Sequence, residues 1–450
     1  MDRNQTYKGK HVLVVGLAKS GFAAAKLLTS YGAHVVVNDR TPLEENPQAQ
    51  SLVAEGFDVV CGEHPLSLLN TSLDYVVKNP GIPYSNPLIA EAVKRDIPVI
   101  TEVEIAGEVA EAETIAITGS NGKTTTTTLI GEMMKDSGRT PIVAGNIGTV
   151  LSEVADASTK DDLLIAELSS FQLMGTIHYA PKIAVLLNIF EAHLDYHGTL
   201  DEYAKAKGRI FANQKSTDFA VYNADDEKVV SLVKGTQGVK VPFSTTQDCP
   251  TGGCIKDGVL YFKGEKVISE REIVLPGKHN KENILAAVCA ALLGGAKKEQ
   301  IVAVLTSFTG VKHRLQFVEM IAGRKFYNDS KATNILATQA AISAFEQEII
   351  LLAGGLDRGN EFDELIPQLK SVKTLILFGE SAPKLARAAK DAGVPTIMMA
   401  HDVAEAVPLA YEASNEGDII LLSPACASWD QYKTFEQRGD IFISAVHKLK

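Results

Sequence analysis

The sequence contains few cysteines and no long apolar run. Five cysteines occur in 450 residues without a Cys-x-x-Cys pair, and Cys249 and Cys254 flank a Pro-Thr-Gly-Gly turn. This spacing argues against a disulfide framework and against a zinc ribbon. No apolar run approaches the ~20 residues that span a bilayer, and Met1–Lys10 lacks the apolar centre of a signal peptide. We therefore expect a cytoplasmic protein without membrane insertion.

The sequence also lacks an excess of basic residues. It has 44 lysines and arginines against 55 acidic residues, which gives a formal net charge of −11. Such a chain is a poor general binder of nucleic acid, so we expect no nucleic-acid partner. A local phosphate site remains possible because it needs only backbone amides and a few cations.

The composition predicts a globular chain of about three domains, at roughly 150 residues each. Hydrophobic residues make up 45% and charged residues 22% of the sequence. Apolar β-branched runs alternate with helical stretches, which is typical of parallel sheets covered by helices. The expected strands are His11–Val15, His34–Asn38, Tyr75–Lys78, Thr114–Thr118, Leu163–Glu167, Ile183–Asn188, Phe219–Asn223, Ile349–Ala353, Thr374–Phe378 and Asp418–Leu422.

One stretch departs from this alternation. Val241–Leu275 consists of short apolar runs interrupted by Asp257-Gly258 and by Gly264, so we expect antiparallel hairpins there. The acidic helical piece Glu102–Glu113 ends just before a new strand and suggests a domain boundary near Glu111. The polar turn Thr309–Arg314 suggests a second boundary near Gly310. The predicted domains are therefore residues 1–110, 111–310 and 311–450.

A first phosphate-type turn follows the strand His11–Val15. The segment from Gly16 to Gly21 leads into a helix, and Asp39 ends the next strand, where an acidic side chain can accept from a ribose hydroxyl. Ala18 replaces the middle glycine that would let backbone approach a pyrophosphate. Both a nucleotide site and a tight turn without a ligand remain open.

A second phosphate-type turn is more specific. A strand ends at Thr118, and the residues up to Thr125 read Gly-Ser-Asn-Gly-Lys-Thr-Thr, with the P-loop core at Gly122–Thr124. Lysine bridges nucleotide phosphates there and the threonine hydroxyl faces Mg²⁺. Ile117 stands where the usual first glycine would be, but we still expect ATP to bind.

Other polar side chains follow neighbouring strands. Glu167 ends an apolar strand, where an acid for the metal is expected, although a solvated glutamate is the alternative. His193 follows the next strand and is placed as a metal or phosphate ligand rather than as a structural histidine. Lys207 lies on a helix with Lys205 and Arg209, and this spacing alone favours a solvated basic face.

Together these motifs resemble the Mur ligases, which are ATP-dependent amide ligases of peptidoglycan precursor synthesis. The resemblance runs nearly end to end and is carried by Thr118–Thr125, Glu167–Gln172, His193 with Lys207, Gly277–Asn283, Phe326–Asn334, Ser423–Gln431 and Phe435–Gly439. It implies an α/β fold of three domains. A Rossmann-like N-terminal domain would bind the UDP substrate, a central P-loop domain with a small antiparallel insertion would bind ATP, and a Rossmann-like C-terminal domain would bind the amino acid.

The resemblance also implies cofactors. Thr124 and Glu167 would hold one Mg²⁺, and His193 would hold a second together with Lys207, which the family carries as a CO₂-derived carbamate. Lys123, Glu167, His193 and Lys207 would form the catalytic group. An oxygen-rich shell that keeps waters and phosphate oxygens suits Mg²⁺ better than Zn²⁺.

Binding residues follow from the same resemblance or from loop position. ATP would contact Gly119, Ser120, Asn121, Gly122, Lys123, Thr124, Thr125, Asn283, Arg314 and Asp329. D-glutamate would contact Lys331, Thr333, Arg358, Ser428 and Phe435. Candidates for the UDP substrate are Lys19, Ser20, Asp39, Asn79, Gly81 and Asn146.

The segments Phe326–Asn334 and Ser423–Gln431 look like those of the family members that join D-glutamate to UDP-N-acetylmuramoyl-L-alanine through an acyl phosphate. We expect that reaction, in a monomer whose domains close on the substrates. The alternatives are a ligase that adds another amino acid or glutamylates folate, an NAD-dependent oxidoreductase, and a nucleotide-binding switch protein. The oxidoreductase would leave the P-loop, Glu167 and His193 unexplained.

Overall fold

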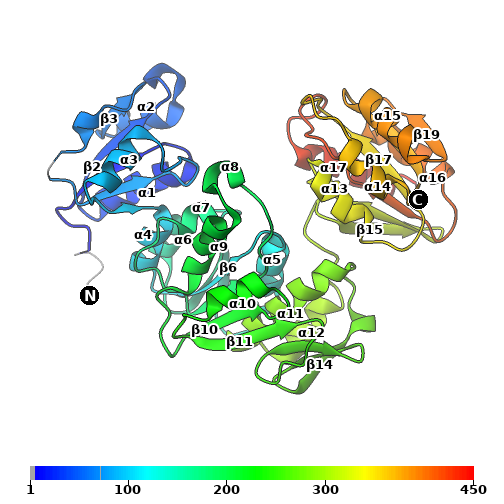
Figure 1. The fold of residues 1–450 in the computed structure, drawn as a ribbon, viewed down its shortest axis with the longest axis horizontal. Coiled ribbons are helices and arrows are strands. Elements are labelled where there is room, and N and C mark those ends of the chain that lie inside the picture. The colour runs from blue at the N-terminus through cyan, green and yellow to red at the C-terminus, as the bar shows by residue number, and fades with distance from the viewer. Residues whose placement is uncertain (1–5, 71, 450) are drawn as a thin grey trace. The chain divides into compact units, whose positions relative to one another are not determined.

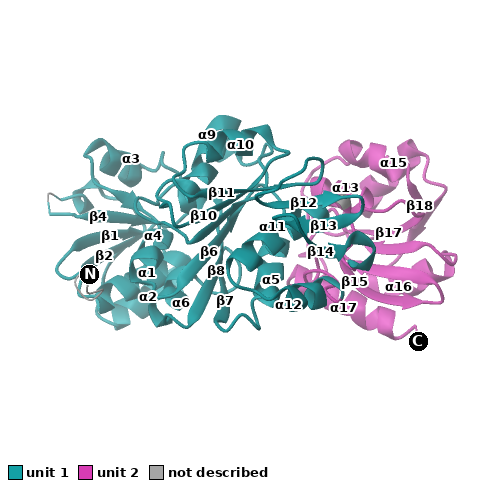
Figure 2. Ribbon diagram, turned by 90° about the horizontal axis from the view of Figure 1, so that it is seen from below, with its two compact units in different colours: residues 1–273, 281–306 teal, residues 274–280, 307–450 magenta. Residues whose placement is uncertain are grey.

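The computed structural model describes residues 6–70 and 72–449, apart from the side chains of Lys278 and His279. The first five residues of the polar Met1–Lys10 segment lie outside this range. The chain divides into two compact units (Figure 2), one made of Met1–Ile273 and Lys281–Thr306 and the other of Val274–Asn280 and Ser307–Lys450. Within the described ranges, no helix is both long enough and apolar enough to cross a membrane.

The first unit begins with a five-stranded parallel sheet in the order β3-β2-β1-β4-β5 (Figure 1). Its central strand β1 is buried along four of its five residues, as expected for a sheet covered on both faces. Its strands are β1 (His11–Val15), β2 (His34–Asp39), β3 (Asp58–Cys61), β4 (Tyr75–Lys78) and β5 (Val99–Ile100). The accompanying helices are α1 (Lys19–Ser30), α2 (Pro47–Ala54), α3 (Pro87–Lys94) and α4 (Glu102–Val109).

The second sheet of this unit has nine strands in the order β14-β13-β12-β11-β10-β9-β6-β8-β7. Its strands are β6 (Glu113–Thr118), β7 (Thr140–Gly145), β8 (Asp162–Glu167), β9 (Ile183–Leu186), β10 (Phe219–Asn223), β11 (Val239–Ser244), β12 (Gly253–Lys256), β13 (Val259–Phe262) and β14 (Glu265–Ser269). Its helices are α5 (Lys123–Met133), α6 (Leu151–Ala157), α7 (Ser170–Leu173), α8 (Leu194–His197), α9 (Leu200–Gly208), α10 (Glu227–Val233), α11 (Lys278–Leu293) and α12 (Lys298–Leu305). Because β6 pairs in parallel with both β8 and β9, the carboxyl ends of these three strands lie at one edge.

The expectation of hairpins throughout Val241–Leu275 is wrong at its start. β11 pairs in parallel with β10, and β12 pairs in parallel with β11, so the parallel sheet continues into this stretch. Only β12, β13 and β14 form antiparallel hairpins. Their two turns are Asp257-Gly258 and Lys263-Gly264, and all four residues have positive φ, as two-residue hairpin loops require.

The second unit contains a six-stranded sheet in the order β15-β16-β20-β17-β18-β19, parallel except for the edge strand β15. Its strands are β15 (Gln316–Ile321), β16 (Arg324–Asn328), β17 (Ile349–Gly354), β18 (Val372–Phe378), β19 (Thr396–Met399) and β20 (Ile419–Leu422). Its helices are α13 (Ile335–Ile342), α14 (Ile366–Leu369), α15 (Ala382–Ala392), α16 (Val403–Glu412) and α17 (Phe435–His447). Two buried clusters of side chains cover the two faces of this sheet.

The expected α/β architecture with three sheets is confirmed, whereas the domain boundaries near residues 110 and 310 stay predictions. The expected turn between Cys249 and Cys254 is present, since the amide of Gly252 donates to the Cys249 carbonyl at 3.0 Å. All five cysteines are free thiols, and only Cys61 is not buried.

Candidate functional site

The P-loop connects β6 to α5 at the edge where the strands of the second sheet end. Gly119 and Gly122 both have positive φ, 157° and 83°, and the first turn of α5 begins at Lys123. Asn188, just after β9, holds the loop from the neighbouring strand. Its side-chain oxygen accepts from the Asn121 amide at 2.9 Å, and its carbonyl accepts from the Ser120 amide. Sequence reasoning missed Asn188, although its position after a strand beside the P-loop is a usable signal.

The Lys123 side chain folds back over the loop. Its ammonium donates to the carbonyls of Gly119 and Ser120 at 2.9 and 3.0 Å. Asn283, on α11, packs against the other side, because a Cβ added at Gly122 would lie 2.0 Å from the Asn283 Oδ1. The structure thus brings together the P-loop residues and Asn283, which are far apart in sequence.

Glu167 is the last residue of β8, beside the P-loop, and one of its two carboxylate oxygens has no hydrogen-bond partner among the described residues. Its Oε1 accepts from the Asn146 side-chain amide at 2.9 Å, while the buried Oε2 has no hydrogen-bond partner among the described residues. A buried carboxylate oxygen without a donor is costly unless a cation or a ligand reaches it. The Asn146 side chain, which is predicted to contact the UDP substrate, lies against this glutamate.

Lys207 is buried on α9, with 1% of its surface exposed, which contradicts the solvated basic face that spacing alone favours. Its ammonium donates to the Gly119 carbonyl at 2.8 Å and lies 4.8 Å from the centre of the Tyr203 ring. Burial, reinforced by the nearby charge of Lys123, holds the pKa of Lys207 well below its usual value. The neutral amine is therefore favoured far more than in an ordinary lysine.

His193 lies just before α8 and is exposed. It adopts a left-handed backbone with φ of 55°, which is uncommon for a residue other than glycine. Partial desolvation and the positive charge of Lys207 lower the pKa of His193, so the neutral imidazole is favoured. The Phe171 ring packs edge-on against it, with ring centres 5.0 Å apart.

The residues of this edge fit a magnesium ion that arrives with phosphates rather than a metal held by protein alone. No group of three or more histidine, cysteine or acidic side chains converges in the described part of the chain. The free oxygen of Glu167 and the buried Thr124 are oxygen donors of the kind that Mg²⁺ uses together with substrate phosphates and waters.

The turn between β1 and α1 is closely packed. A Cβ at Gly21 would lie 1.9 Å from the Gly16 carbonyl oxygen, so only glycine fits there. The Asp39 carboxylate accepts from the amides of Leu17 and Thr41 at 2.7 and 2.8 Å. Asp39 therefore holds the turn through one oxygen, at Leu17, and the start of its own loop through the other, at Thr41.

The other N-terminal candidates gather around the same turn. The Asn79 side chain donates to the Ser20 hydroxyl at 3.0 Å and accepts from the Gly81 amide at 3.2 Å. Lys19 is exposed at the start of α1. Four of the six predicted UDP-substrate residues are thus linked or adjacent at this turn, and Asp39 contacts it through Leu17. Asn146 lies elsewhere, directly after β7 of the second sheet.

In the second unit, Asp329 is buried at the end of β16. It accepts from the Leu315 amide at 3.0 Å and from the Ser423 hydroxyl at 2.9 Å. Burial raises the pKa of Asp329 to about 7. The Nε of Arg314 and the Oγ of Ser428 are buried without a hydrogen-bond partner among the residues described, so both have capacity for a ligand.

The remaining D-glutamate candidates lie on loops of the same sheet. The Lys331 ammonium lies 5.5 Å from the centre of the Phe435 ring, and the Phe435 carbonyl accepts from the Ser330 hydroxyl. Thr333 is half-buried, two residues beyond Lys331. Arg358 is exposed, and its guanidinium lies 4.8 Å from the centre of the Trp429 ring.

Sequence reasoning quoted Arg438 within a motif but gave it no role. This side chain is fully buried and donates to the carbonyls of Gly354, Ser330 and Cys426 and to the Ser330 hydroxyl. Burial lowers its pKa to about 10. Arg438 therefore ties together three loops that carry predicted ligand residues.

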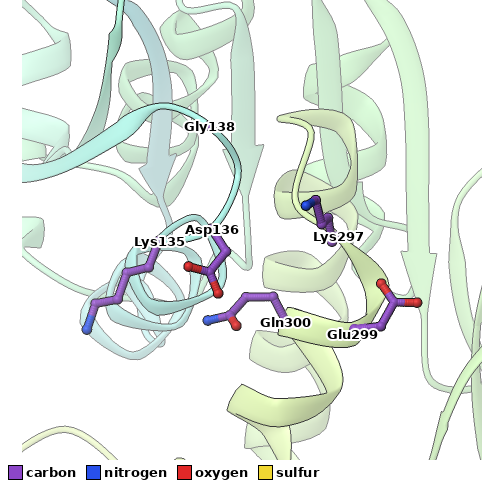
Figure 3. Close-up of a pocket in the computed structure, with 6 residues that line it drawn as sticks. All are labelled: Lys135, Asp136, Gly138, Lys297, Glu299 and Gln300. Atoms are coloured by element: carbon purple, nitrogen blue, oxygen red, sulfur yellow. The ribbon is translucent and has the colours of Figure 1, made fainter.

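A surface hollow of about 620 Å³ lies away from these residues, between the end of α5 and the start of α12 (Figure 3). Lys135 and Glu299 point away from one another there, and the lining polar groups do not converge on one point. None of the predicted site residues lines this hollow.

Comparison with known proteins agrees with this arrangement. Residues 10–101 match the MurD-like N-terminal domain of the Mur ligases, residues 117–291 the Mur ligase middle domain, and residues 313–426 the glutamate ligase domain. The chain therefore belongs to the Mur ligase family, and it is an enzyme of the ligase class.

Two relatives and two solved structures are similar to nearly the whole chain. A Geobacillus protein named UDP-N-acetylmuramoylalanine--D-glutamate ligase is 60% identical over 451 residues, covering 100% of each chain. A Bacillus cytotoxicus protein of the same name is 60% identical over 98% of each chain. Among solved structures, the UDP-N-acetylmuramate-alanine ligase MurC of Thermotoga maritima has a TM-score of 0.58 at 18% identity, over 98% of this chain and 100% of that one. The MurF ligase of the same organism, in complex with ADP, has a TM-score of 0.57 at 16% identity, over 99% of this chain and 97% of that one.

Proposed function

We propose that this chain uses ATP to join D-glutamate to UDP-N-acetylmuramoyl-L-alanine, through an acyl phosphate, in peptidoglycan precursor synthesis. The observation that carries the phosphoryl-transfer part is the edge formed by the P-loop, Glu167 and Lys207. The choice of acceptor and amino acid is supported by the full-length relatives that bear this name at 60% identity.

ATP would lie with its phosphates on the amides of the loop from Gly119 to Thr125. Two anions, the nucleotide and the acceptor carboxylate, must meet, so positive charge has to be concentrated at this edge. Lys123 would exchange its contacts with the Gly119 and Ser120 carbonyls for phosphate oxygens. Asn283, Arg314 and Asp329 would hold the rest of the nucleotide.

Magnesium would be held by Thr124 and Glu167, with a second ion at His193 and a carbamate on Lys207. When bound, the ions would neutralise phosphate charge during transfer. Carbamylation needs a neutral amine to add to CO₂ with loss of a proton, and the lowered pKa of Lys207 supplies that form. The depressed pKa of His193 likewise favours the neutral imidazole that a metal requires.

D-glutamate would bind in the second unit. Its two carboxylates need at least two cationic or donor sites. The exposed Arg358, the Lys331 ammonium, and the unsatisfied hydroxyl of Ser428 offer them, with Thr333 and Phe435 completing the set.

The test is phosphate release from ATP and Mg²⁺ with each substrate omitted in turn, with mass detection of the product. We expect release only when UDP-N-acetylmuramoyl-L-alanine and D-glutamate are both present, and a product heavier by one glutamate residue. A different required amino acid would overturn the specificity. Release that depends on neither acceptor would overturn the ligase reaction.

A matched pair of lysine variants tests the site itself. K123A should lower kcat by at least a hundredfold because the phosphate cation is lost. K135A removes an exposed lysine just beyond the end of α5. The ion pair of this lysine in the described residues is with Glu132, so K135A should leave activity unchanged. Equal activity of the two variants would argue against the P-loop site.

A further inference from the structure

Lys78, at the end of β4, is a buried lysine without a carboxylate partner in the residues described. Only 1% of its surface is exposed. Its ammonium donates to the carbonyls of Pro80 and Ile82 at 3.1 and 3.0 Å and to the Tyr196 hydroxyl at 3.2 Å, with the Asn79 carbonyl more distant at 3.5 Å. The three protons of the ammonium are therefore used within the protein.

Such a lysine is expensive to bury. Burial lowers its pKa to about 8, and an apolar side chain of the same length would avoid the cost of desolvating an ammonium. The ammonium fixes the loop, because the carbonyls of Asn79, Pro80 and Ile82 all turn toward it. The rings of Tyr84 and Tyr196, 5.0 and 5.9 Å from it, add cation–π stabilisation.

The fixed loop carries the proposed UDP-substrate contacts. Asn79 and Gly81 belong to it, and Asn79 reaches Ser20 on α1. The loop also lies against the glycine turn, because a Cβ at Gly16 would fall 2.6 Å from the Ile82 side chain. A change in the loop would therefore displace the groups that would meet the UDP end of the substrate.

Tyr196, on α8 beside the second sheet of the unit, contacts the same loop. Its hydroxyl donates to the Ile82 carbonyl at 2.9 Å. Its ring packs edge-on against Phe171, with ring centres 4.6 Å apart, and Phe171 packs in turn against His193. A continuous set of contacts thus runs from the loop of the first sheet to the histidine at the phosphate edge.

We propose that Lys78 and Tyr196 are positioning residues that lock the loop Asn79–Ile82 in the shape that receives the UDP end of the substrate, and that hold this loop in register with His193. This inference rests on the proposed function. It assigns neither residue a direct contact with the reacting atoms, because the hydrogen-bonding groups of both are already used within the protein.

The test is steady-state kinetics of K78M, K78Q and Y196F, varying each of the three substrates separately. K78M keeps the length of the side chain and removes its donors, so we expect KM for UDP-N-acetylmuramoyl-L-alanine to rise at least tenfold. KM for D-glutamate should stay within twofold. K78Q, which can still donate to two carbonyls, should recover part of the loss, and Y196F should raise the same KM about threefold. K94M, at an exposed lysine on α3, is the matched control and should behave as wild type.

The outcomes separate the two proposals. If the wild-type protein does not turn over UDP-N-acetylmuramoyl-L-alanine, the proposed function fails. If it does, and K78M has a wild-type KM or raises the KM of every substrate equally, the positioning role is overturned. Should K78M fail to fold, Y196F decides, because it removes one hydroxyl from a half-buried ring, and an unchanged KM would then overturn the inference.

Discussion

At the scale of single residues, Asp329 and Arg438 are buried charged groups of the second unit that the apolar pattern of its strands does not reveal. Asp329 follows β16 and Arg438 lies on α17, and each is satisfied by backbone groups and by a serine rather than by an opposite charge. Each should therefore leave a distinct signature in the stability of this unit. The single tryptophan of the sequence, Trp429, lies in the same unit and offers a local fluorescence signal.

Asp329 makes stability depend on pH. Its pKa is raised from 3.8 to about 7, so the native state binds more protons than the unfolded chain between these values, and stability must fall as pH rises through this window. We expect the unfolding free energy of wild type, relative to D329N, to fall by up to about 4 kcal/mol between pH 4 and pH 8. Urea titrations followed by Trp429 fluorescence measure this. Parallel pH curves for the two proteins would contradict it.

Arg438 should be a major source of stability. In R438M the carbonyls of Gly354, Ser330 and Cys426 lose a buried donor, and each unpaired group costs about 1–3 kcal/mol. We expect the unfolding free energy of the second unit to fall by about 3 kcal/mol or more. R387M, at an exposed arginine with surface ion pairs, should leave the urea midpoint close to that of wild type. An unchanged urea midpoint in R438M would refute this role.

At the scale of elements, the P-loop shows how one glycine can be required for two reasons. Gly122 has a positive φ and also faces Asn283, whereas Gly138 has a similar φ of 86° with nothing within 4 Å of an added Cβ. Substitutions at Gly122 and Gly138 can therefore be compared to separate the effect of backbone strain from the effect of the close approach of Asn283.

G122A should therefore weaken binding of a fluorescent ATP analogue at least tenfold, because the new methyl group must displace Asn283 from the loop. G138A carries only the backbone strain of about 1–3 kcal/mol and should bind the analogue within twofold of wild type. Similar losses in both variants would mean that strain, and not the approach of Asn283, decides.

The elements also show how far the sequence predicts this fold. Buried parallel strands such as β1, β10 and β17 were predicted within a residue because most of their positions are apolar. Several strands that were not predicted, such as β7 and β15, lie at sheet edges, where one side is exposed and polar residues or proline interrupt the pattern. The parallel pairing of β11 depends on a distant strand and leaves no local signal.

The sequence likewise predicts some residues of the candidate site and not others. P-loop residues and Glu167 follow from spacing and strand ends, and the structure brings them together. The burial of Lys207 could not be read from its polar helix, because it depends on the fold of Thr118 and Gly119 beneath it. Lys78 and Arg438 were missed because most of their partners are backbone carbonyls, which carry no sequence signature. Asn188 was missed although its position after a strand beside the P-loop was a usable signal.

At the scale of the whole molecule, the proposed ATP residues belong to both units. Lys123 and Thr124 lie in the first, and Arg314 and Asp329 lie in the second. The closure of the domains that the sequence predicts would protect an acyl phosphate from water.

We therefore expect small-angle scattering to show a smaller radius of gyration when a non-hydrolysable ATP analogue, UDP-N-acetylmuramoyl-L-alanine and D-glutamate are all present. Replacing Arg314 by alanine should reduce the contraction, because the second unit loses a group that would contact the nucleotide. An unchanged radius with all ligands would sink the idea of closure.

The cysteines bear on how such a motion could be followed. Burial raises the pKa of the Cys249 thiol to about 11 and also raises the pKa of Cys61, Cys289 and Cys426. Maleimide dyes react with thiolates, so these four thiols should label slowly at neutral pH, and burial restricts the access of a dye to Cys254. A pair of cysteines introduced on exposed positions of the two units would then take up donor and acceptor dyes selectively, and single-molecule energy transfer could record opening and closing without first removing a native thiol.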